Sequence, residues 1–401
     1  MADPPRVMLV AAEASGDALG AGLARALKAR LGKGVDFVGV GGAKMAAEGV
    51  QSPFDIAELS VLGLFEGVKA YPRVVRHADQ TAALAEETNP DVAVLIDSWG
   101  FTLRVAQRLR KRMPGLPIVK YVGPQVWATR PGRARTLAAT VDVLLTQYPF
   151  EAPYFEAAGL KTITVGAAAL QRDFSRADPA RLRAHIGADA DAPILLVLPG
   201  SRPGEIARIG PSFGAAVDIL TAARPGLKVV IPVAGTVAAL VRGQTANWRS
   251  APILVEDETL KADAFRAGTV ALACSGTVTT ELALAGCPMV VGYRLGAVTY
   301  AILKRLIRTP YVTLFNVAAG RFVAPERIQH QCTGEILAAD LAALLDDPER
   351  RATQITDQNV ALDKMGRGQG DPAAMAAQAV IGMIQPPSPP AGEGIGATAA
   401  G

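Results

Sequence analysis

The stretch "LACSGTVTTELALAGCPMVVGY", residues 272–293, contains the alternation that decides the fold. It begins with an apolar run, passes through a Ser-Gly-Thr turn into a helix-length segment, and ends in a second apolar run. A short buried strand followed by a helix and another strand is typical of a parallel sheet. Because ligands of such sheets gather beyond the carboxyl ends of strands, the turn is also a candidate binding site.

The same alternation extends along the chain in two series. The first series comprises "VMLVAA", "VDFVGV", "VAVLID", "IVKYV", "VDVLLT" and "TITVG". The second series comprises "ILLVLPGSR", "KVVIPVA", "ILVED", "TVALACSG" and "MVVGY". Helices are expected between the early strands, over residues 17–31, 66–87 and 101–112. The sequence therefore predicts an α/β protein with two Rossmann-like, doubly wound domains that face a cleft.

Changes in composition suggest where these domains begin and end. Residues 171–193 are rich in charge, Ala and Asp/Pro, and they separate the two series. We expect one domain over residues 1–170, a second over 171–345, and helices over 346–384 that pack back toward the first domain. Residues 385–401, "QPPSPPAGEGIGATAAG", have no apolar periodicity and are expected to be disordered.

Composition also excludes several classes of protein. The chain has 401 residues, of which 50% are hydrophobic, but no apolar run approaches the roughly 20 residues that span a bilayer. The N-terminus lacks the pattern of a secretory signal, so a cytoplasmic protein is expected. Three cysteines and three histidines without metal-ligand spacing predict no metal site. A net charge of +4, without a basic–aromatic motif, gives no reason to expect nucleic acid as a partner.

The turn within "LPGSRPGEI", residues 198–206, follows a strand and precedes a helix. Gly200 allows a ligand to approach the backbone, and Ser201 and Arg202 follow it with groups that suit phosphate oxygens. This pattern favours a diphosphate ligand. The alternative is an ordinary turn with a surface arginine.

The Ser-Gly-Thr turn supplies a second candidate for the same ligand. Ser275, Gly276 and Thr277 stand where a helix begins, and backbone N–H groups at a helix start favour an anion. Glu281, just over one turn further on, suits ribose hydroxyls. The alternative is a plain helix cap and a solvated carboxylate. Two such turns favour a nucleotide diphosphate, whereas the absence of a Walker motif or an early Gly-x-Gly-x-x-Gly argues against ATP and dinucleotides.

Several ordered blocks of the chain resemble one known family. They are "AAEASGDALGAGL", "VGPQVWATRPGR", "LPGSRPGEI", "CSGTVTTELALAGCPMVVGY" and "LKRLIRTPYVTLFNVAAGR". Together they are similar to lipid-A-disaccharide synthase, a bacterial glycosyltransferase of family 19 with the GT-B fold. The resemblance runs from about Val7 to beyond Gln329. It implies an inverting transfer of 2,3-diacylglucosamine from its UDP derivative to 2,3-diacylglucosamine 1-phosphate (lipid X), giving a β-1,6 disaccharide and UDP without a cofactor.

The resemblance also implies roles for individual residues. In the second domain, the expected UDP-sugar pocket comprises Gly200, Ser201, Arg202, Ser275, Gly276, Thr277 and Glu281, with Asn316 and Arg321 as further candidates. In the first, acceptor-binding domain, Asp97 is the candidate general base that takes the proton of the attacking sugar hydroxyl. Glu13, Ser15 and Asp17 line the turn after the first strand, and the two acids are the next catalytic candidates. The alternatives are that Asp17 only caps a helix and that Asp97 is an N-cap.

Three departures from the family pattern accompany these roles. After Asp97 the family usually continues Ala/Ser-Pro-Asp-Phe-Asn, whereas this chain has residues 98–102 as Ser-Trp-Gly-Phe-Thr, so the second acid is replaced by Gly100. Residues 166–168 are Gly-Ala-Ala where Gly-His-Pro or Gly-Asn-Pro is common. Phe322 stands where an acid commonly follows Ala-Gly-Arg.

Acylated substrates imply contact with a membrane surface. Residues 59–77 place apolar side chains ahead of basic ones, a pattern that suits an interface with anionic lipid. The candidate contact residues are Val61, Leu62, Leu64, Phe65, Arg73 and Arg76. The basic runs at 108–112 and 304–308 add to the attraction, and the expected location is the cytoplasmic face of the inner membrane. The alternative is a buried helix with a solvated charged face.

The sequence leaves three other functions open. Two are GT-B enzymes: a MurG-like N-acetylglucosaminyl transferase and a UDP-N-acetylglucosamine 2-epimerase. The third is a non-catalytic relative that binds a UDP-sugar or lipid. The sequence also leaves open whether the protein is a monomer or a homodimer.

Overall fold

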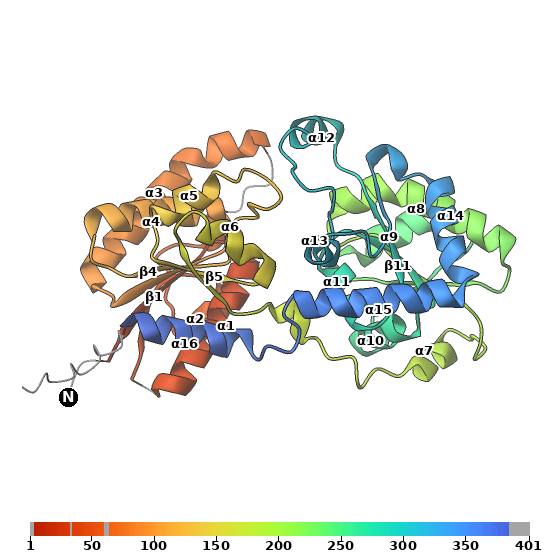
Figure 1. Cartoon of the computed structure of the whole chain (residues 1–401), viewed down its shortest axis with the longest axis horizontal. Coiled ribbons are helices and arrows are strands. Elements are labelled where there is room, and N and C mark those ends of the chain that lie inside the picture. Colours follow the sequence, from red (N-terminus) through yellow and green to blue (C-terminus); the bar gives the residue numbers. More distant parts are fainter. Residues whose placement is uncertain (1–3, 33, 60–63, 385–401) are drawn as a thin grey trace, which may run out of the picture.

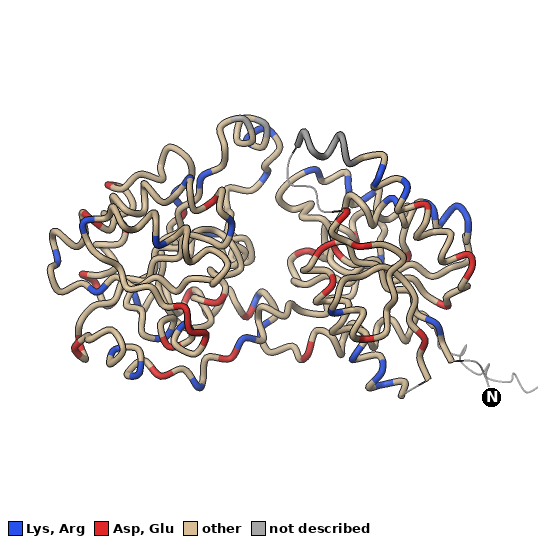
Figure 2. The backbone as a smooth tube through the Cα atoms, turned by 180° about the vertical axis from the view of Figure 1, so that it is seen from behind, with Lys and Arg blue, Asp and Glu red and all other residues tan. Residues whose placement is uncertain are grey.

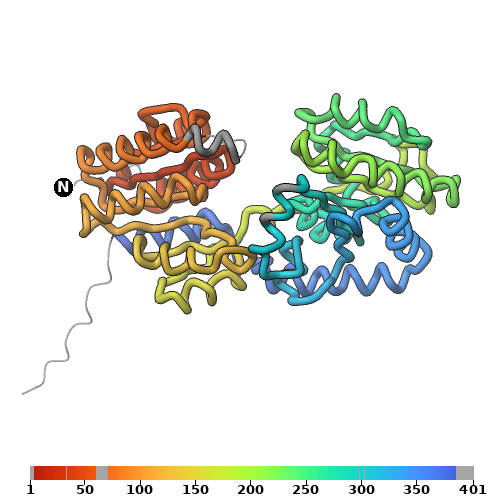
Figure 3. The backbone as a smooth tube through the Cα atoms, turned by 90° about the horizontal axis from the view of Figure 1, so that it is seen from above, coloured from red at the N-terminus to blue at the C-terminus, as the bar shows by residue number. Residues whose placement is uncertain are grey.

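The computed structural model describes residues 4–32, 34–59 and 64–384. Two α/β domains lie side by side, each built around one six-stranded sheet, and both views of the backbone separate them clearly (Figures 1 and 3). Parts of the predicted membrane patch and the whole C-terminal tail, residues 60–63 and 385–401, lie outside the described residues.

The N-terminal sheet is parallel throughout, with strand order β2-β1-β3-β4-β5-β6. Its strands are β1 (Arg6–Ala11), β2 (Asp36–Val40), β3 (Val92–Ile96), β4 (Ile118–Tyr121), β5 (Val143–Thr146) and β6 (Lys161–Thr164). Its helices are α1 (Ala14–Leu31), α2 (Ala43–Ala47), α3 (Leu64–Thr88), α4 (Trp99–Arg112), α5 (Arg133–Ala138) and α6 (Ala152–Glu156), with short 3-10 turns at η1 (Ile56–Leu59) and η2 (Pro149–Glu151).

The C-terminal sheet is also parallel, with strand order β12-β11-β10-β7-β8-β9. Its strands are β7 (Ile194–Leu198), β8 (Lys228–Pro232), β9 (Ile253–Val255), β10 (Val270–Cys274), β11 (Met289–Tyr293) and β12 (Glu326–Ile328). The helices are α7 (Pro179–His185), α8 (Pro203–Ala223), α9 (Ala238–Thr245), α10 (Glu258–Ala267), α11 (Thr277–Leu284), α12 (Ala297–Leu303), α13 (Leu314–Ala319), α14 (Gly334–Leu345) and α15 (Pro348–Lys364), and the 3-10 turns are η3 (Ala168–Gln171), η4 (Gly235–Val237) and η5 (Gln329–Gln331).

The strand sequences explain why helices cover both faces of each sheet. Successive side chains of a strand point to opposite faces, so an unbroken apolar run is buried on both sides. In β1, Met8 and Val10 join one hydrophobic core, whereas Val7 and Leu9 join another on the opposite face. The central strands β3 and β10 are buried along their whole length. This arrangement confirms the predicted doubly wound α/β fold.

All eleven predicted strands are present, and the described part of the chain contains one further strand that was not predicted. The extra strand, β12, has only three residues and begins with the buried carboxylate of Glu326. A strand this short and polar carries no periodic signal. The predicted helices are also present, and each begins two or three residues earlier than expected, at Ala14, Leu64 and Trp99.

The last two helices belong to different domains. Helix α15 lies against the C-terminal sheet, where the Gln354 side chain accepts a hydrogen bond from Met289 N at 2.7 Å and donates to Met289 O at 3.1 Å. Helix α16 (Pro372–Ile384) returns to the N-terminal domain and packs against α1 (Figure 1). Its Ala376 and Val380 enter the core that contains Leu23 of α1.

Candidate active site

Each sheet has one topological switch point, where the strand order reverses direction. In the N-terminal sheet the switch lies between β1 and β3, and in the C-terminal sheet it lies between β7 and β10. Connections on the two sides of a switch point leave in opposite directions, which opens a crevice at the carboxyl ends of those strands. The turns that carry the predicted site residues follow these four strands. The fold therefore places the turn after β1 beside the turn after β3, and the turn after β7 beside the turn after β10.

The C-terminal switch point holds a cavity of about 480 Å³. Seven of the nine residues predicted for the UDP-sugar pocket line it: Gly200, Ser201, Arg202, Ser275, Gly276, Thr277 and Glu281. They come from the turn after β7 and from the turn and helix α11 that follow β10. Sequence patterns 75 residues apart thus converge on one cavity, as the nucleotide hypothesis requires.

The turn after β7 is shaped by Gly200. Its φ of +101° is disfavoured for other residues, and a Cβ there would lie 3.1 Å from Glu205 Oε2 and 3.5 Å from Cys274 Sγ. Arg202 follows with its side chain 80% exposed, and its guanidinium pairs with Glu205 at 3.2 Å. Because an exposed ion pair contributes little, that guanidinium is readily available to an anion in the cavity.

The turn after β10 presents backbone donors to the same cavity. Gly276 precedes α11, and no side chain caps this helix. The first N–H groups of a helix have no partner within the helix itself, so they suit an anionic ligand here. The hydroxyl of Ser275, in the same turn, donates to Val312 O at 3.4 Å.

Arg172 is a cavity residue that sequence reasoning missed. Its guanidinium forms an ion pair with Glu281 and lies 5.3 Å from the ring centroid of Phe174 and 5.7 Å from that of Phe265. Arg172 follows η3 in the connection between the domains, so only the folded connection brings it to Glu281. An isolated arginine in a charged linker gives no signal of this contact.

The structure places Asn316 and Arg321 outside the cavity. Asn316 is fully buried; its Nδ2 donates to Ala324 O at 3.0 Å and Glu326 Oε1 at 2.8 Å, and its Oδ1 accepts from Val323 N at 2.7 Å. Arg321 is exposed and forms an ion pair with Asp357 at 2.6 Å. Both side chains are therefore engaged in contacts that stabilise the loop before β12.

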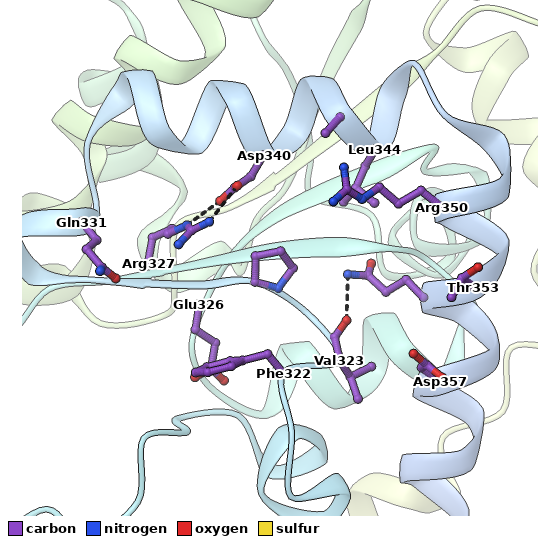
Figure 4. Close-up of a pocket in the computed structure, with 13 residues that line it drawn as sticks. Phe322, Val323, Glu326, Arg327, Gln331, Asp340, Leu344, Arg350, Thr353 and Asp357 are labelled. Carbon is purple, nitrogen blue, oxygen red and sulfur yellow. Dashed lines mark hydrogen bonds and ion pairs between the residues drawn. The ribbon is translucent and has the colours of Figure 1, made fainter.

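A larger hollow of about 560 Å³ lies elsewhere, between α14, α15 and the sheet edge at β12 (Figure 4). Its polar side chains are mostly paired with one another or with the backbone. The guanidinium of Arg327 donates two hydrogen bonds to the Asp340 carboxylate, at 2.5 and 2.8 Å. The Gln354 side chain donates from Nε2 to Val323 O. None of the predicted site residues lines this hollow, although Phe322, a departure from the family pattern, does.

Asp97 lies at the N-terminal switch point, directly after β3. It has a left-handed φ of +51°, and Ser98 follows at +38°. The N-cap of α4 is Ser98, without a side-chain cap bond, so the Asp97 carboxylate does not cap the helix. Ser15, from the start of α1, donates from Oγ to Asp97 Oδ2 at 3.2 Å. The half-buried carboxylate therefore keeps acceptor positions open to a ligand.

Lys120 is a second residue that sequence reasoning missed. It lies on β4 beside β3, is fully buried, and donates from Nζ to Asp97 O and to Thr102 Oγ1, the latter at 3.0 Å. Burial lowers the pKa of Lys120 to about 7, and the negative charge of Asp97 opposes this shift. The signal in the sequence is one lysine inside the apolar run "IVKYV".

The pKa of Lys120 predicts a pH-dependent stability. Between about pH 7 and 10.5 the unfolded chain keeps a proton on this amine that the folded chain has released, so the parent gains stability as the pH rises through this window. Lys120→Met removes that dependence. The parent should therefore gain, relative to the variant, on the order of 4 kcal/mol in free energy of unfolding as the pH rises from 6.5 to 10. Denaturant unfolding at several pH values measures it, and a pH-independent difference would contradict it.

Asp17 has a structural role. Its carboxylate is 5% exposed and accepts hydrogen bonds from the backbone N–H groups of Gly42, Lys44 and Met45 at 2.8, 3.0 and 3.0 Å. Asp17 therefore caps α2, rather than the helix that contains it. These three bonds occupy the Asp17 carboxylate. At the N-terminal switch point, Asp97 and Glu13 are then the acids whose carboxylates remain available to a ligand. Glu13 is exposed, and its side chain caps no helix.

The positions where this chain departs from the family pattern have ordinary structural surroundings. Ala167 is buried in the core that also contains Leu170, and Gly166 has a φ of +87°. A Cβ at Gly100 would meet nothing within 4 Å, so the lost second acid leaves open space. Phe322 is 54% exposed and packs edge-on against Tyr311, with ring centroids 5.0 Å apart. Within residues 4–32, 34–59 and 64–384 there is no group of His, Cys, Asp and Glu side chains arranged to hold a metal.

Known proteins share this fold. The structure of UDP-GlcNAc 2-epimerase from Neisseria meningitidis bound to UDP-GlcNAc superposes with a TM-score of 0.59 at 12% identity, covering 94% of this chain and 99% of that one. MurG of Acinetobacter baumannii superposes with a TM-score of 0.55 at 16% identity, covering 95% and 99%. Identities this low show the fold alone, which is the predicted GT-B arrangement.

Sequence comparison is more specific. The family model for lipid-A-disaccharide synthetase matches residues 7–380. The chain is 41% identical over 381 residues to the lipid-A-disaccharide synthase of Rhodospirillum centenum, with 95% of each covered. It is 39% identical over 385 residues to that of Pseudomonas aeruginosa, with 96% of this chain and all of the relative covered. The chain therefore belongs to the lipid-A-disaccharide synthetase family, whose members are glycosyltransferases.

Proposed function

We propose that the two switch points hold the two substrates of one glycosyl transfer. The donor, UDP-2,3-diacylglucosamine, binds at the C-terminal switch point, and the acceptor, 2,3-diacylglucosamine 1-phosphate, binds at the N-terminal one. The observation that carries this proposal is that the predicted diphosphate turns line one cavity, whereas the candidate base follows β3 of the other sheet. Family membership supports lipid A disaccharide formation as the reaction.

In the donor site, we assign the diphosphate to the turns after β7 and β10. Backbone N–H groups at Gly276 and Thr277 and the exposed guanidinium of Arg202 provide donors for its oxygens. Glu281, oriented by Arg172, is the acceptor for ribose hydroxyls. A UDP-sugar ligand agrees with the related fold of the epimerase bound to UDP-GlcNAc.

In the acceptor site, we assign Asp97 as the general base. The 6-hydroxyl of the acceptor attacks the anomeric carbon of the donor from the face opposite UDP, the bond to UDP breaks, and the hydroxyl proton passes to the carboxylate. Ser15 orients one carboxylate oxygen through its 3.2 Å hydrogen bond. Lys120 and Thr102 both donate to Asp97 O and so hold the left-handed turn that aims the carboxylate.

The donor specificity distinguishes this function from its GT-B alternatives. We expect purified protein to release UDP from the acylated UDP-sugar in the presence of acceptor and to leave UDP-N-acetylglucosamine unchanged. A 2-epimerase would instead convert UDP-N-acetylglucosamine into its 2-epimer without acceptor. NMR of the sugar nucleotide measures both outcomes, and epimerisation would refute the proposal.

Arg202→Ala should chiefly weaken binding of UDP. The substitution removes a charged hydrogen bond to UDP worth about 1.5 to 3 kcal/mol. Its loss raises the dissociation constant of UDP roughly ten- to a hundredfold. Calorimetric titration with UDP measures the effect. Arg242→Ala is a matched control, because that arginine pairs with Glu256 at 2.6 Å and does not line the cavity. Unchanged affinity in folded Arg202→Ala would remove Arg202 from the site.

We further propose that the N-terminal part of α3 contacts the membrane surface. None of the helices within the described residues is long and apolar enough to span a bilayer. Leu64 and Phe65 open α3, Val61 and Leu62 lie outside the described residues, and Arg73 and Arg76 are exposed further along the helix. Figure 2 shows basic positions along α3 and beside α12, at the top of both domains. Acyl chains and anionic headgroups suit such a combination.

Removal of both exposed arginines tests this contact. In Arg73→Gln/Arg76→Gln we expect affinity for vesicles containing phosphatidylglycerol to fall roughly tenfold or more, since each basic residue near an anionic surface contributes about 1 kcal/mol. Vesicle sedimentation measures the affinity. Arg30→Gln/Arg249→Gln removes the same net charge from two other exposed positions. Equal losses in both double variants would show a net-charge effect and contradict a specific surface.

A further inference from the structure

The loop after β4 lies at the boundary between the two domains. Residues 122–132 follow β4 and lead into α5, and β4 pairs with β3 and so ends beside Asp97. Within this loop, Thr129 forms an antiparallel bridge with Ile307 of the C-terminal domain, and Arg308 N donates to Ala128 O at 3.0 Å. The loop is therefore positioned to contact a substrate held between the domains.

A tight turn where this loop enters α5 carries an arginine at each end. Arg133 N donates to Arg130 O at 3.0 Å, and Arg130 has a left-handed φ of +51°. The turn from Arg130 to Arg133, here called the arginine turn, therefore places both side chains on one short stretch of chain. The guanidinium carbon of Arg133 lies 5.0 Å from the ring centroid of Trp99, which opens α4 two residues after Asp97. One end of the turn thus contacts Trp99, the second residue after the candidate base.

The positive charge of the arginine turn has no carboxylate partner among the described residues. Burial lowers the pKa of Arg133, and the charge of Arg130 lowers it further. Elsewhere in the same domain, three arginines of α4 are paired: Arg108 with Asp79 at 2.6 Å, Arg110 with Asp142 at 2.8 Å, and Arg112 with Glu86 at 3.1 Å. Two adjacent like charges, one of them half-buried, are unfavourable until an anion binds.

We propose that the arginine turn binds the phosphate monoester of the acceptor. The assignment rests on the proposed function, because it needs an acceptor that carries a phosphate. Two guanidinium groups offer forked donors to a phosphate dianion, and Trp99 limits the freedom of one of them. The donor diphosphate has its own arginine and backbone donors in the other domain. Binding the phosphate at this turn, which contacts Trp99 at the start of α4, orients the acceptor sugar so that its hydroxyl can attack the donor.

The test compares two acceptors that differ only in the phosphate. With 2,3-diacylglucosamine 1-phosphate in detergent micelles, Arg133→Gln and Arg130→Gln should each lower kcat/KM about ten- to a hundredfold, chiefly through KM. With 2,3-diacylglucosamine lacking the phosphate, parent and variants should agree within about threefold. Arg135→Gln, an exposed arginine of α5, should behave as the parent with both acceptors.

Three outcomes overturn the inference: unchanged kcat/KM in both variants, an equal loss with both acceptors, or a loss that occurs only on anionic vesicles and is the same for both acceptors. The last would assign the turn to lipid headgroups. Equilibrium binding of the phosphorylated acceptor to the parent and to Arg133→Gln measures affinity at this site independently of turnover. If the parent binds this acceptor through Arg133 but never forms a disaccharide, the proposed function fails while the phosphate site stands.

Discussion

Asp97→Asn should lower turnover by about 10² to 10⁴, the usual contribution of a general base, while UDP affinity stays within about threefold. The amide keeps the shape of the side chain and accepts the Ser15 hydrogen bond, but it cannot take the proton of the attacking hydroxyl. The UDP cavity belongs to the other domain, so its turns should be unaffected. Rates of UDP release with both substrates, together with calorimetric UDP titration, measure the two effects.

Two further variants make this result specific. Ser15→Ala removes only the hydrogen bond that orients the carboxylate, so its turnover should fall less than in Asp97→Asn. Glu13→Gln changes the other open acid at the N-terminal switch point and should retain near-parent turnover. If Asp97→Asn turns over like the parent and Glu13→Gln does not, the base is Glu13 and Asp97 is structural.

Asp17→Ala should lower the free energy of unfolding by about 2 to 4 kcal/mol, because three backbone N–H groups at the start of α2 lose their acceptor in a largely buried site. The unfolding temperature should fall accordingly. Turnover per folded molecule should remain within a few-fold of the parent, since the carboxylate is occupied in the fold. Thermal unfolding and initial rates at a temperature where both proteins are folded measure the two quantities.

Asp36→Ala is a matched control for this stability effect. Asp36 is exposed, and its ion pair with Arg6 at 3.5 Å should contribute well under 1 kcal/mol. A loss of turnover in Asp17→Ala without a loss of stability would contradict the structural assignment and return Asp17 to the catalytic candidates.

The parts of the fold that the sequence predicts are those with a local physical cause. Runs such as "VAVLI" are apolar on both faces, which requires a strand covered on both sides, and the intervening segments have helical length. The diphosphate turns are also local: glycine and serine after a strand mark the carboxyl ends of β7 and β10. Their positions along the chain, together with the alternation of strands and helices, suffice to predict the cavity that they line.

The residues that the sequence does not predict depend on contacts made only in the folded chain. Arg172 reaches Glu281 across 109 positions of sequence, and Lys120 reaches the Asp97 turn from the neighbouring strand. Asn316 follows a family motif, yet it is buried against Glu326 on a strand too short to be predicted. Asp17 had two plausible local roles, and only the position of α2 shows where its carboxylate points.

The central claim is that one catalytic cycle uses both switch points, with an acylated UDP-sugar at one and the acceptor sugar phosphate at the other. Its most direct test is UDP release measured with donor and acceptor together and with each alone, accompanied by mass spectrometry of the lipid product. We expect rapid release and a disaccharide 1-phosphate only when both are present. Binding of UDP without release in the complete mixture would contradict the account and identify a non-catalytic UDP-sugar-binding protein.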